Sequence, residues 1–152
     1  MVDPARTGAL DLVLELTVLL EEDMRTGLAK DGLTGSRAHL LWVLRERGPC
    51  TQRELADALG ISPRGVTGLV DVLEATGFVT RRPHPTDRRA SLVGPTDHGE
   101  RVTARLAAGH EELADQLFGD LPEERLRCLT DGLQHVLHRL REQLAAPEVT
   151  GG

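Results

Sequence analysis

The sequence predicts a mostly helical fold with a small antiparallel β-hairpin, and three observations lead to this prediction. Apolar residues recur at helical spacing in long stretches near both ends of the chain. Two short helical segments in the middle are separated by a tight turn at Gly60. The proline- and arginine-rich stretch 81–99 follows, with strand-forming residues on either side of its turn signals. About six helices with a two- to three-stranded hairpin in this order indicate a winged helix-turn-helix.

The bulk composition is that of a single domain. A chain of 152 residues can bury a hydrophobic core without metal or disulfide. Cys50 and Cys128 form no CxxC pair, so we expect two small buried residues and a reducing compartment, the cytoplasm. The first apolar stretch, Ala9–Leu20, contains Asp11 and Glu15, which argues against a membrane span or a signal peptide.

Charge is unevenly distributed along the chain. The net charge of −6 alone disfavours nucleic acid as a partner. Residues 1–30 carry six acids and three bases, and residues 111–148 carry nine acids and four bases. Residues 36–94 carry nine bases and six acids, a local charge of +3. Double-stranded DNA therefore remains a plausible partner for the middle of the chain.

The first two helices are expected to form part of the core and an interface. Apolar residues of Ala9–Leu28 occupy more than one helical face, so this helix should pack on its own body and on a partner subunit. After the turn signal at Asp31, Ser36 can cap a second helix that runs to Arg47. Its core positions are four aliphatic residues, Leu40, Leu41, Val43 and Leu44.

The next two helices have the composition of a helix-turn-helix. Thr51 and Glu54 form a capping box that starts a helix ending at Leu59. Ser62 can then cap a second helix, Pro63–Thr76, which we call the recognition helix. Its buried stripe comprises Val66, Leu69, Val70 and Leu73, and its opposite face carries Arg64, Gly65, Thr67, Gly68 and Asp71. The small residues let the helix approach DNA closely, while the arginine and threonine can reach a base or a phosphate.

The hairpin that follows, which we call the wing, should consist of strands Phe78–Arg82 and Ser91–Val93. Asp87 can cap its own turn and hold the Arg89 guanidinium by a charge-assisted bond. An arginine held at the tip of a thin ribbon fits a DNA minor groove. The candidate DNA-binding residues are Thr51, Ser62, Arg64, Gly65, Thr67, Arg81, Asp87, Arg88 and Arg89.

The last two helices predict a dimer interface. Thr96 should cap a helix that ends at Phe118, and Pro122 suits the first turn of the last helix. The apolar seam of the last helix is more than a small winged-helix body can cover, so we expect an intersubunit bundle of the first, fifth and last helices. The candidate dimerisation residues are Leu10, Val13, Leu133, Val136, Leu137 and Leu140. We thus assign 36–95 to the DNA-binding lobe, 8–30 and 96–145 to dimerisation, and 146–152 to a frayed tail.

The wing also carries a family signature. Asp87-Arg88-Arg89, followed by Val93, Thr96 and Gly99, resembles the D-R-R-x-x-x-V-x-L-T-x-x-G pattern of MarR-type winged helix-turn-helix repressors, with Pro95 in place of the usual leucine. The order of elements agrees with that family over 9–144. The resemblance implies a homodimeric transcriptional regulator, a ligand-responsive repressor acting on a pseudo-palindromic operator, with an effector pocket between dimer bundle and DNA-binding lobe.

Catalysis has no candidate constellation, because no nucleophile with a base, no phosphate-binding loop and no paired carboxylates occur at recognisable spacing. We therefore expect no enzyme. The alternative to a DNA-binding regulator is a protein-interaction module that has kept the winged fold, which would lack a basic recognition face.

Zinc is the one cofactor that the resemblance suggests besides a small-molecule effector. Aligned with zinc-responsive members of the family, Glu21, His39 and His110 fall on ligand positions, while Leu106 replaces a further histidine. Three such ligands with water could hold Zn²⁺. The alternative is a hydrogen-bonded pair of histidines at a helix junction.

Overall fold

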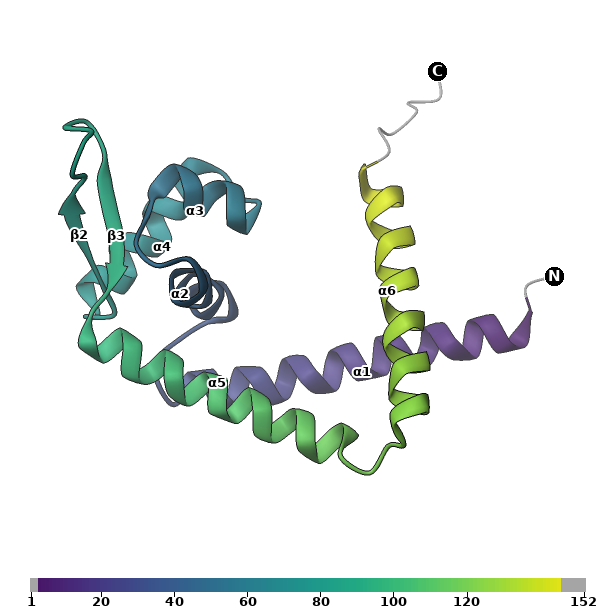
Figure 1. Ribbon diagram of the computed structural model, residues 1–152. Coiled ribbons are helices and arrows are strands. Elements are labelled where there is room, and N and C mark those ends of the chain that lie inside the picture. The colour runs from purple at the N-terminus through teal and green to yellow at the C-terminus, as the bar shows by residue number, and fades with distance from the viewer. Residues whose placement is uncertain (1–2, 146–152) are drawn as a thin grey trace, which may run out of the picture. The chain divides into compact units, whose positions relative to one another are not determined.

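The computed structural model describes residues 3–145, which form six helices and one three-stranded antiparallel sheet (Figure 1). This confirms the predicted fold class. The chain divides into two compact units, residues up to 107 and residues from 108 onwards. The elements are α1 (Pro4–Ala29), α2 (Gly35–Arg47), β1 (Cys50–Thr51), α3 (Gln52–Leu59), α4 (Pro63–Ala75), β2 (Val79–Pro83), β3 (Ser91–Pro95), α5 (Asp97–Phe118) and α6 (Glu123–Ala145).

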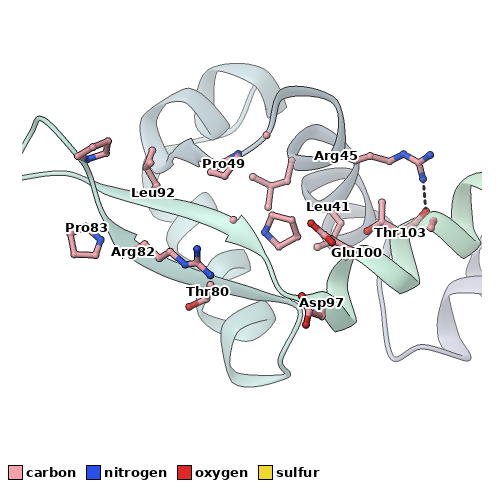
Figure 2. Close-up of a pocket in the computed structure, with 16 residues that line it drawn as sticks. Leu41, Arg45, Pro49, Thr80, Arg82, Pro83, Leu92, Asp97, Glu100 and Thr103 are labelled. Carbon is pink, nitrogen blue, oxygen red and sulfur yellow. Dashed lines mark hydrogen bonds between the residues drawn. The ribbon is translucent and has the colours of Figure 1, made fainter.

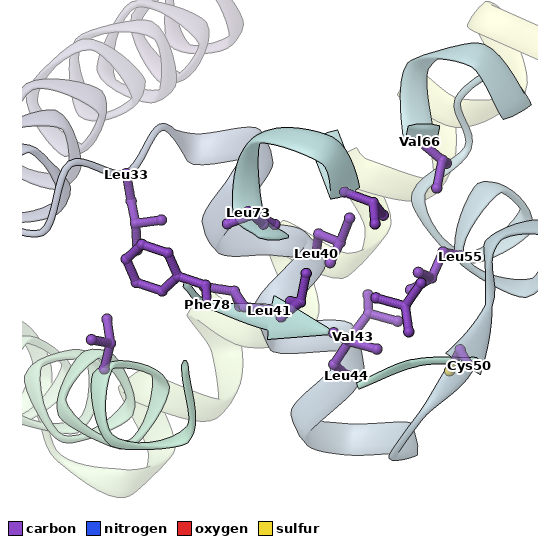
Figure 3. Packing of buried hydrophobic residues seen from close by; sticks show 14 of the residues in the cluster. Leu33, Leu40, Leu41, Val43, Leu44, Cys50, Leu55, Val66, Leu73 and Phe78 are labelled. Carbon is purple, nitrogen blue, oxygen red and sulfur yellow. The ribbon is translucent and has the colours of Figure 1, made fainter. Parts of the chain in front are cut away.

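The hydrophobic core of the first unit lies between α2, α3, α4 and the sheet (Figure 3). All four predicted core positions of α2 are buried, as are Val66, Val70 and Leu73 of the recognition helix, while Leu69 is half-buried. Leu55 of α3 and Val93 of β3 are fully enclosed. This core fixes the recognition helix by its apolar stripe and leaves the opposite face outside.

The helix-turn-helix begins at the predicted residues, and α4 ends at Ala75, one residue before the predicted Thr76. The Glu54 amide donates to Thr51 Oγ1 at 3.2 Å, and the Thr51 amide donates to the Glu54 carboxylate at 2.7 Å. Gly60 ends α3 in the left-handed region, with φ of 64°. Ser62 Oγ then accepts the Gly65 amide at 3.1 Å and starts α4. The helix-turn-helix is thus fixed by local hydrogen bonds.

The cap predicted for α2 is wrong by two residues. Thr34, not Ser36, is the N-cap, and its hydroxyl accepts the Arg37 amide at 3.4 Å. Both residue types accept such a bond equally well, so composition alone does not choose between them. Thr34 is the cap because its backbone is extended, as a capping residue requires, whereas Ser36 already lies within the helix.

The sheet has the strand order β1-β3-β2, so the wing strand β2 is at an edge. Arg81 pairs with Val93 and Pro83 with Ser91, and this edge position tolerates a proline that cannot donate. Strand β2 lies one residue further along the chain than predicted, and β3 begins at the predicted Ser91 but continues past Val93 to Pro95. The two-residue β1, which the sequence does not indicate, pairs Cys50 with Val93.

The wing and α5 are joined at a crowded backbone contact. Phe78 O accepts the Thr96 amide at 3.0 Å. The Thr96 hydroxyl donates to Gly77 O at 2.6 Å and lies 3.2 Å from Phe78 O. Thr96 Oγ1 in turn accepts the Gly99 amide at 3.0 Å, which is the predicted cap of the fifth helix. A Cβ at Gly99 would lie 2.1 Å from Phe78 O. Only glycine fits at this position without displacing the backbone.

Much apolar surface of α1 and α6 is uncovered in the single chain. In α1 only Leu28 is buried, which is far less than the predicted packing of one whole side. The described part of α6 has no buried residue. The exposed large apolar side chains of these helices are Leu10, Leu12, Leu14, Leu16, Val18, Leu19, Met24, Leu129, Leu133, Val136, Leu137, Leu140 and Leu144. Among residues 3–145, no helix is long and apolar enough to cross a bilayer.

The two cysteines have different surroundings. Cys50 is buried as predicted, and burial, with a smaller contribution from Glu54, raises the pKa of its thiol. Cys128 is exposed on α6, so the prediction of a small buried residue is wrong there. The predicted frayed tail, 146–152, lies outside the described residues.

Candidate nucleic-acid interface

The outer face of the recognition helix α4 is open to solvent. Arg64, Gly65, Thr67, Gly68 and Asp71 are all exposed, as predicted. Among residues 3–145, a Cβ at position 68 would have no neighbour within 4 Å, so no described residue occupies the space above this glycine. The Arg64 guanidinium makes no ion pair within the described residues. This face can therefore approach a flat or grooved surface closely and offer one unpaired cation.

The two predicted residues at helix starts are engaged locally. The Thr51 hydroxyl is part of the capping box and also lies 2.9 Å from Glu54 Oε2. These bonds, the amide bond first, lower the pKa of the Glu54 carboxyl. Ser62 is exposed, and its Oγ is occupied as an acceptor by the cap of α4. The backbone is thereby fixed at the two residues where α3 and α4 begin.

The wing tip is a loop closed by its own backbone. The His84 amide donates to Ala90 O at 3.1 Å, and Asp87 Oδ1 accepts the Arg89 amide at 2.9 Å. Asp87 thus caps its turn, as predicted. The predicted bond from Asp87 to the Arg89 guanidinium is wrong, because the carboxylate is used by the backbone and the described residues contain no ion pair between the two. Arg88 and Arg89 remain exposed, with unpaired guanidinium groups.

His84 also shapes the wing tip, and sequence reasoning missed it. Its Nδ1 accepts the amides of Thr86 at 3.2 Å and of Asp87 at 3.1 Å. One ring nitrogen thereby holds two backbone amides of the loop in place. No pattern in the sequence marks this role, because histidine is not among the usual turn-capping residues.

Arg81, predicted as a DNA contact, lies at the base of the wing and is held by acidic residues. Its guanidinium binds Asp71 Oδ1 at 2.5 Å, the Glu74 carboxylate and, through Nε, Gln52 Oε1 at 3.2 Å. Burial alone would lower the pKa of Arg81, but the bonds to Asp71 and Glu74 outweigh it and the net pKa is raised. Gln52 in turn donates to Thr67 Oγ1 at 2.9 Å. Sequence reasoning missed Gln52, whose partners lie 15 and 29 residues away.

A cavity of about 750 Å³ lies on the other face of the wing sheet (Figure 2). Its walls come from the end of α2, the wing and the start of α5, and Arg45 closes one side by donating to Thr103 O at 3.2 Å. The lining includes apolar side chains and prolines together with two arginines and two carboxylates, namely Leu41, Leu44, Leu92, Pro49, Pro83, Pro95, Arg45, Arg82, Asp97 and Glu100. Its size is that of a small-molecule site.

None of the residues proposed for zinc lines this cavity. His39 lines a smaller cavity of about 300 Å³ with Ile61 and Leu69. Glu21 and His39 belong to the first unit and His110 to the second. Residues 3–145 contain no group of three or more His, Cys, Asp or Glu side chains that could hold a metal ion. The zinc set stays a prediction, which calorimetric titration of zinc into the protein, with His39→Ala/His110→Ala as control, would test.

Comparison with known proteins gives the family. A family model described as MarR family matches residues 31–90. The HTH-type transcriptional regulator YcgE of Bacillus subtilis is 32% identical over 107 residues, which span 66% of this chain and 70% of that protein. The chain belongs to the MarR family.

Solved structures agree with this family membership. The crystal structure of AbsC, a MarR family transcriptional regulator from Streptomyces coelicolor, covers 93% of this chain and 98% of its own, with 25% identity and a TM-score of 0.77. FabT from Streptococcus pneumoniae, crystallised in complex with DNA, has a TM-score of 0.78 over 93% of this chain and 99% of its own. Its 19% identity shows a shared fold alone.

Membership in the MarR family confirms the function class predicted from the sequence. Family members are DNA-binding transcriptional regulators and not enzymes, so this MarR-family chain is a non-enzymatic DNA-binding regulator. The alternative, a protein-interaction module without DNA binding, is set aside. The family model covers the helix-turn-helix and the wing tip, where Arg64, Arg88 and Arg89 are exposed and make no ion pair within residues 3–145.

Proposed function

We propose that this regulator acts as a homodimer on a pseudo-palindromic operator and represses transcription until an effector binds. Each recognition helix would enter a major groove, and each wing would reach the flanking minor groove. Two half-sites about one helical turn apart, roughly 34–36 Å, are the geometry that a two-fold dimer of this motif reads.

The observation that carries the DNA-binding part is the outer face of α4. Exposed glycines at 65 and 68 permit close approach, and Arg64 offers an unpaired guanidinium beside them. Thr67 on the same face has a hydroxyl near the surface. At the wing, Arg88 and Arg89 supply cations on a loop fixed by Asp87.

The test begins with operator fragments selected from random duplexes by the purified protein. Arg64→Ala should weaken binding to the selected fragment by about 1–3 kcal/mol if it contacts a base. The control is Arg125→Ala, since Arg125 is an exposed arginine of α6 outside the proposed interface. Equal binding by parent, Arg64→Ala and Arg125→Ala in gel shifts would remove the recognition helix from the interface.

The homodimer part is supported by the uncovered apolar side chains of α1 and α6. Leu10, Leu133, Val136, Leu137 and Leu140, all proposed dimerisation residues, are between 36% and 57% exposed, and Val13 is half-buried. So many exposed large apolar side chains along one helix are unusual on a soluble monomer, and a second copy would cover them. Sedimentation of the parent protein at micromolar concentration tests this part directly.

The effector part is supported by the cavity beside the wing. Its apolar lining with charged groups at Arg45, Arg82, Asp97 and Glu100 suits a small amphipathic molecule. Because Thr80, Arg82 and Leu92 are wing residues, an occupant would contact the wing itself. Leu92→Trp should fill the cavity and abolish release of DNA by any effector found in a screen, with DNA affinity retained. An undiminished effector response in this variant would place the effector elsewhere.

A further inference from the structure

Arg81 connects three elements of the DNA-binding lobe through its side chain. From β2 it binds Asp71 and Glu74 of α4, and its Nε donates to Gln52, the first residue of α3. The Arg81 amide also donates to Glu74 Oε1 at 3.1 Å. Its side chain is only 24% exposed. A guanidinium with carboxylates on two sides and an amide on a third has few donors left for a phosphate.

These contacts fix which way the Gln52 amide points. Arginine only donates hydrogen bonds, so the Gln52 atom that faces Arg81 Nε must be the carbonyl oxygen Oε1. The amide nitrogen Nε2 therefore faces Thr67 and donates to its hydroxyl at 2.9 Å. Arg81 thus determines that Gln52 is the donor in its hydrogen bond to Thr67.

The Thr67 hydroxyl is restricted in turn. Its proton is donated to Pro63 O at 3.0 Å, because a carbonyl oxygen only accepts. One of the two lone pairs of Thr67 Oγ1 accepts the Gln52 amide. The second lone pair and the methyl group of Thr67 remain available to contact DNA. Phosphate oxygens also only accept, so Thr67 in this state has no proton to offer the DNA backbone.

We propose that Arg81 is a positioning residue, which through Gln52 sets Thr67 as an acceptor-only reader of base edges. Held in this way, Thr67 can accept from the exocyclic amino group of adenine or cytosine, or its methyl can contact that of thymine. Arg81 then contributes to sequence discrimination without touching DNA. This inference rests on the proposed role of the recognition helix in DNA binding.

The specificity ratio, defined as the affinity for the selected operator divided by that for a scrambled duplex, tests the proposal. Loss of a phosphate contact weakens binding to all sequences alike and leaves this ratio unchanged. Loss of a positioning residue lowers the ratio. Gln52→Ala should lower it about tenfold, the scale of one lost base contact, with scrambled-duplex affinity unchanged. Gln116→Ala, on the exposed side of α5, is the matched control and should keep the parent ratio.

Two further measurements distinguish positioning from direct contact. Arg81→Ala should also lower the specificity ratio about tenfold. The double variant Gln52→Ala/Thr67→Ala should have the same specificity ratio as Thr67→Ala alone, because the two residues act as one unit. Asp71→Asn/Glu74→Gln removes two negative charges near DNA, which favours binding by simple electrostatics. We nevertheless expect this double variant to have a lower specificity ratio than the parent, because Arg81 is no longer held by two carboxylates. If Arg81→Ala is unfolded by circular dichroism, the Gln52 and Thr67 variants decide.

The proposal is overturned if Arg81→Ala weakens operator and scrambled duplex by the same factor, or if the effects of Gln52→Ala and Thr67→Ala simply add. A higher ratio for Asp71→Asn/Glu74→Gln would overturn it as well. Failure of the proposed function looks different. In that case the parent itself prefers no sequence, or Arg64→Ala binds the operator like the parent.

Discussion

Gly99→Ala should destabilise the protein, although alanine is normally the better helix former. The added Cβ would lie 2.1 Å from Phe78 O and 3.1 Å from the Phe78 carbonyl carbon. The oxygen cannot simply move away, because it accepts the Thr96 amide at 3.0 Å and the neighbouring Gly77 O accepts the Thr96 hydroxyl at 2.6 Å. Gly109, in the same helix, provides the matched control, since a Cβ there would have no neighbour within 4 Å.

The expected magnitude follows from opposing contributions. Replacing glycine by alanine in a helix gains about 1 kcal/mol. Real Cβ contacts below 3.0 Å essentially never occur, so Gly99→Ala requires a shift of about 1 Å, and such overpacking costs about 1–3 kcal/mol. Weakening the bond from the Thr96 amide adds about 1 kcal/mol. The net change is a loss of about 1–3 kcal/mol for Gly99→Ala, against a gain of up to about 1 kcal/mol for Gly109→Ala.

The assay is urea denaturation of both variants and the parent at one protein concentration, because the stability of a dimer depends on concentration. Gly99→Ala should unfold at lower urea than the parent, and Gly109→Ala at the same or higher urea. If Gly99→Ala were as stable as Gly109→Ala, the contact between Phe78 and α5 would not constrain this position, and the reasoning would be refuted.

Three other changes test the interface, the wing and the capping box. Leu137→Glu should dissociate the proposed dimer, because burying an unpaired carboxylate costs roughly 3 kcal/mol or more. The control Gln134→Glu should remain dimeric. A fully dimeric Leu137→Glu variant in ultracentrifugation would contradict this prediction. Asp87→Ala should weaken operator binding about threefold to tenfold in gel shifts, whereas Asp87→Asn, which keeps the accepting oxygen, should bind like the parent. The pKa of Glu54 is lower in the folded protein than in the unfolded chain. Its hydrogen bonds therefore stabilise the folded state fully above the unfolded-state pKa of about 4.3, and this stabilisation is lost as the pH falls through the folded-state pKa. The stability difference between parent and Glu54→Ala in urea should therefore be present at neutral pH and shrink in acid.

The parts of the fold that depend on neighbours in sequence were predictable. Thr51 and Glu54 are three residues apart, and Ser62 caps an amide three residues on, so each signal lies within one helical turn. The two-residue β1 was not predictable, because its pairing with β3 creates it and its own residues do not. Similarly, the sequence predicts Ser36 as the cap of α2, whereas the extended backbone two residues earlier makes Thr34 the cap.

The candidate site was predictable as a set of exposed groups but not as a network. The face with Arg64 and Thr67 follows from helical periodicity. Arg81 is one of two consecutive arginines, and nothing local distinguishes it from its exposed neighbour Arg82. Its partners Gln52, Asp71 and Glu74 are brought to it by the packing of β2 on α4 and α3, which no pattern in a single sequence reveals.

The bond from Gln52 to Thr67 makes the preferred operator depend on a residue outside the recognition helix. Gln52 belongs to α3, yet it sets what a residue of the recognition helix offers to DNA. A substitution there can change the preferred operator while every residue of the recognition helix stays the same. Changes at Gln52, Arg81 and the two acids of α4 should then be inherited together, because each alters the hydrogen-bonding state of the others. Relatives with identical recognition helices need not share an operator.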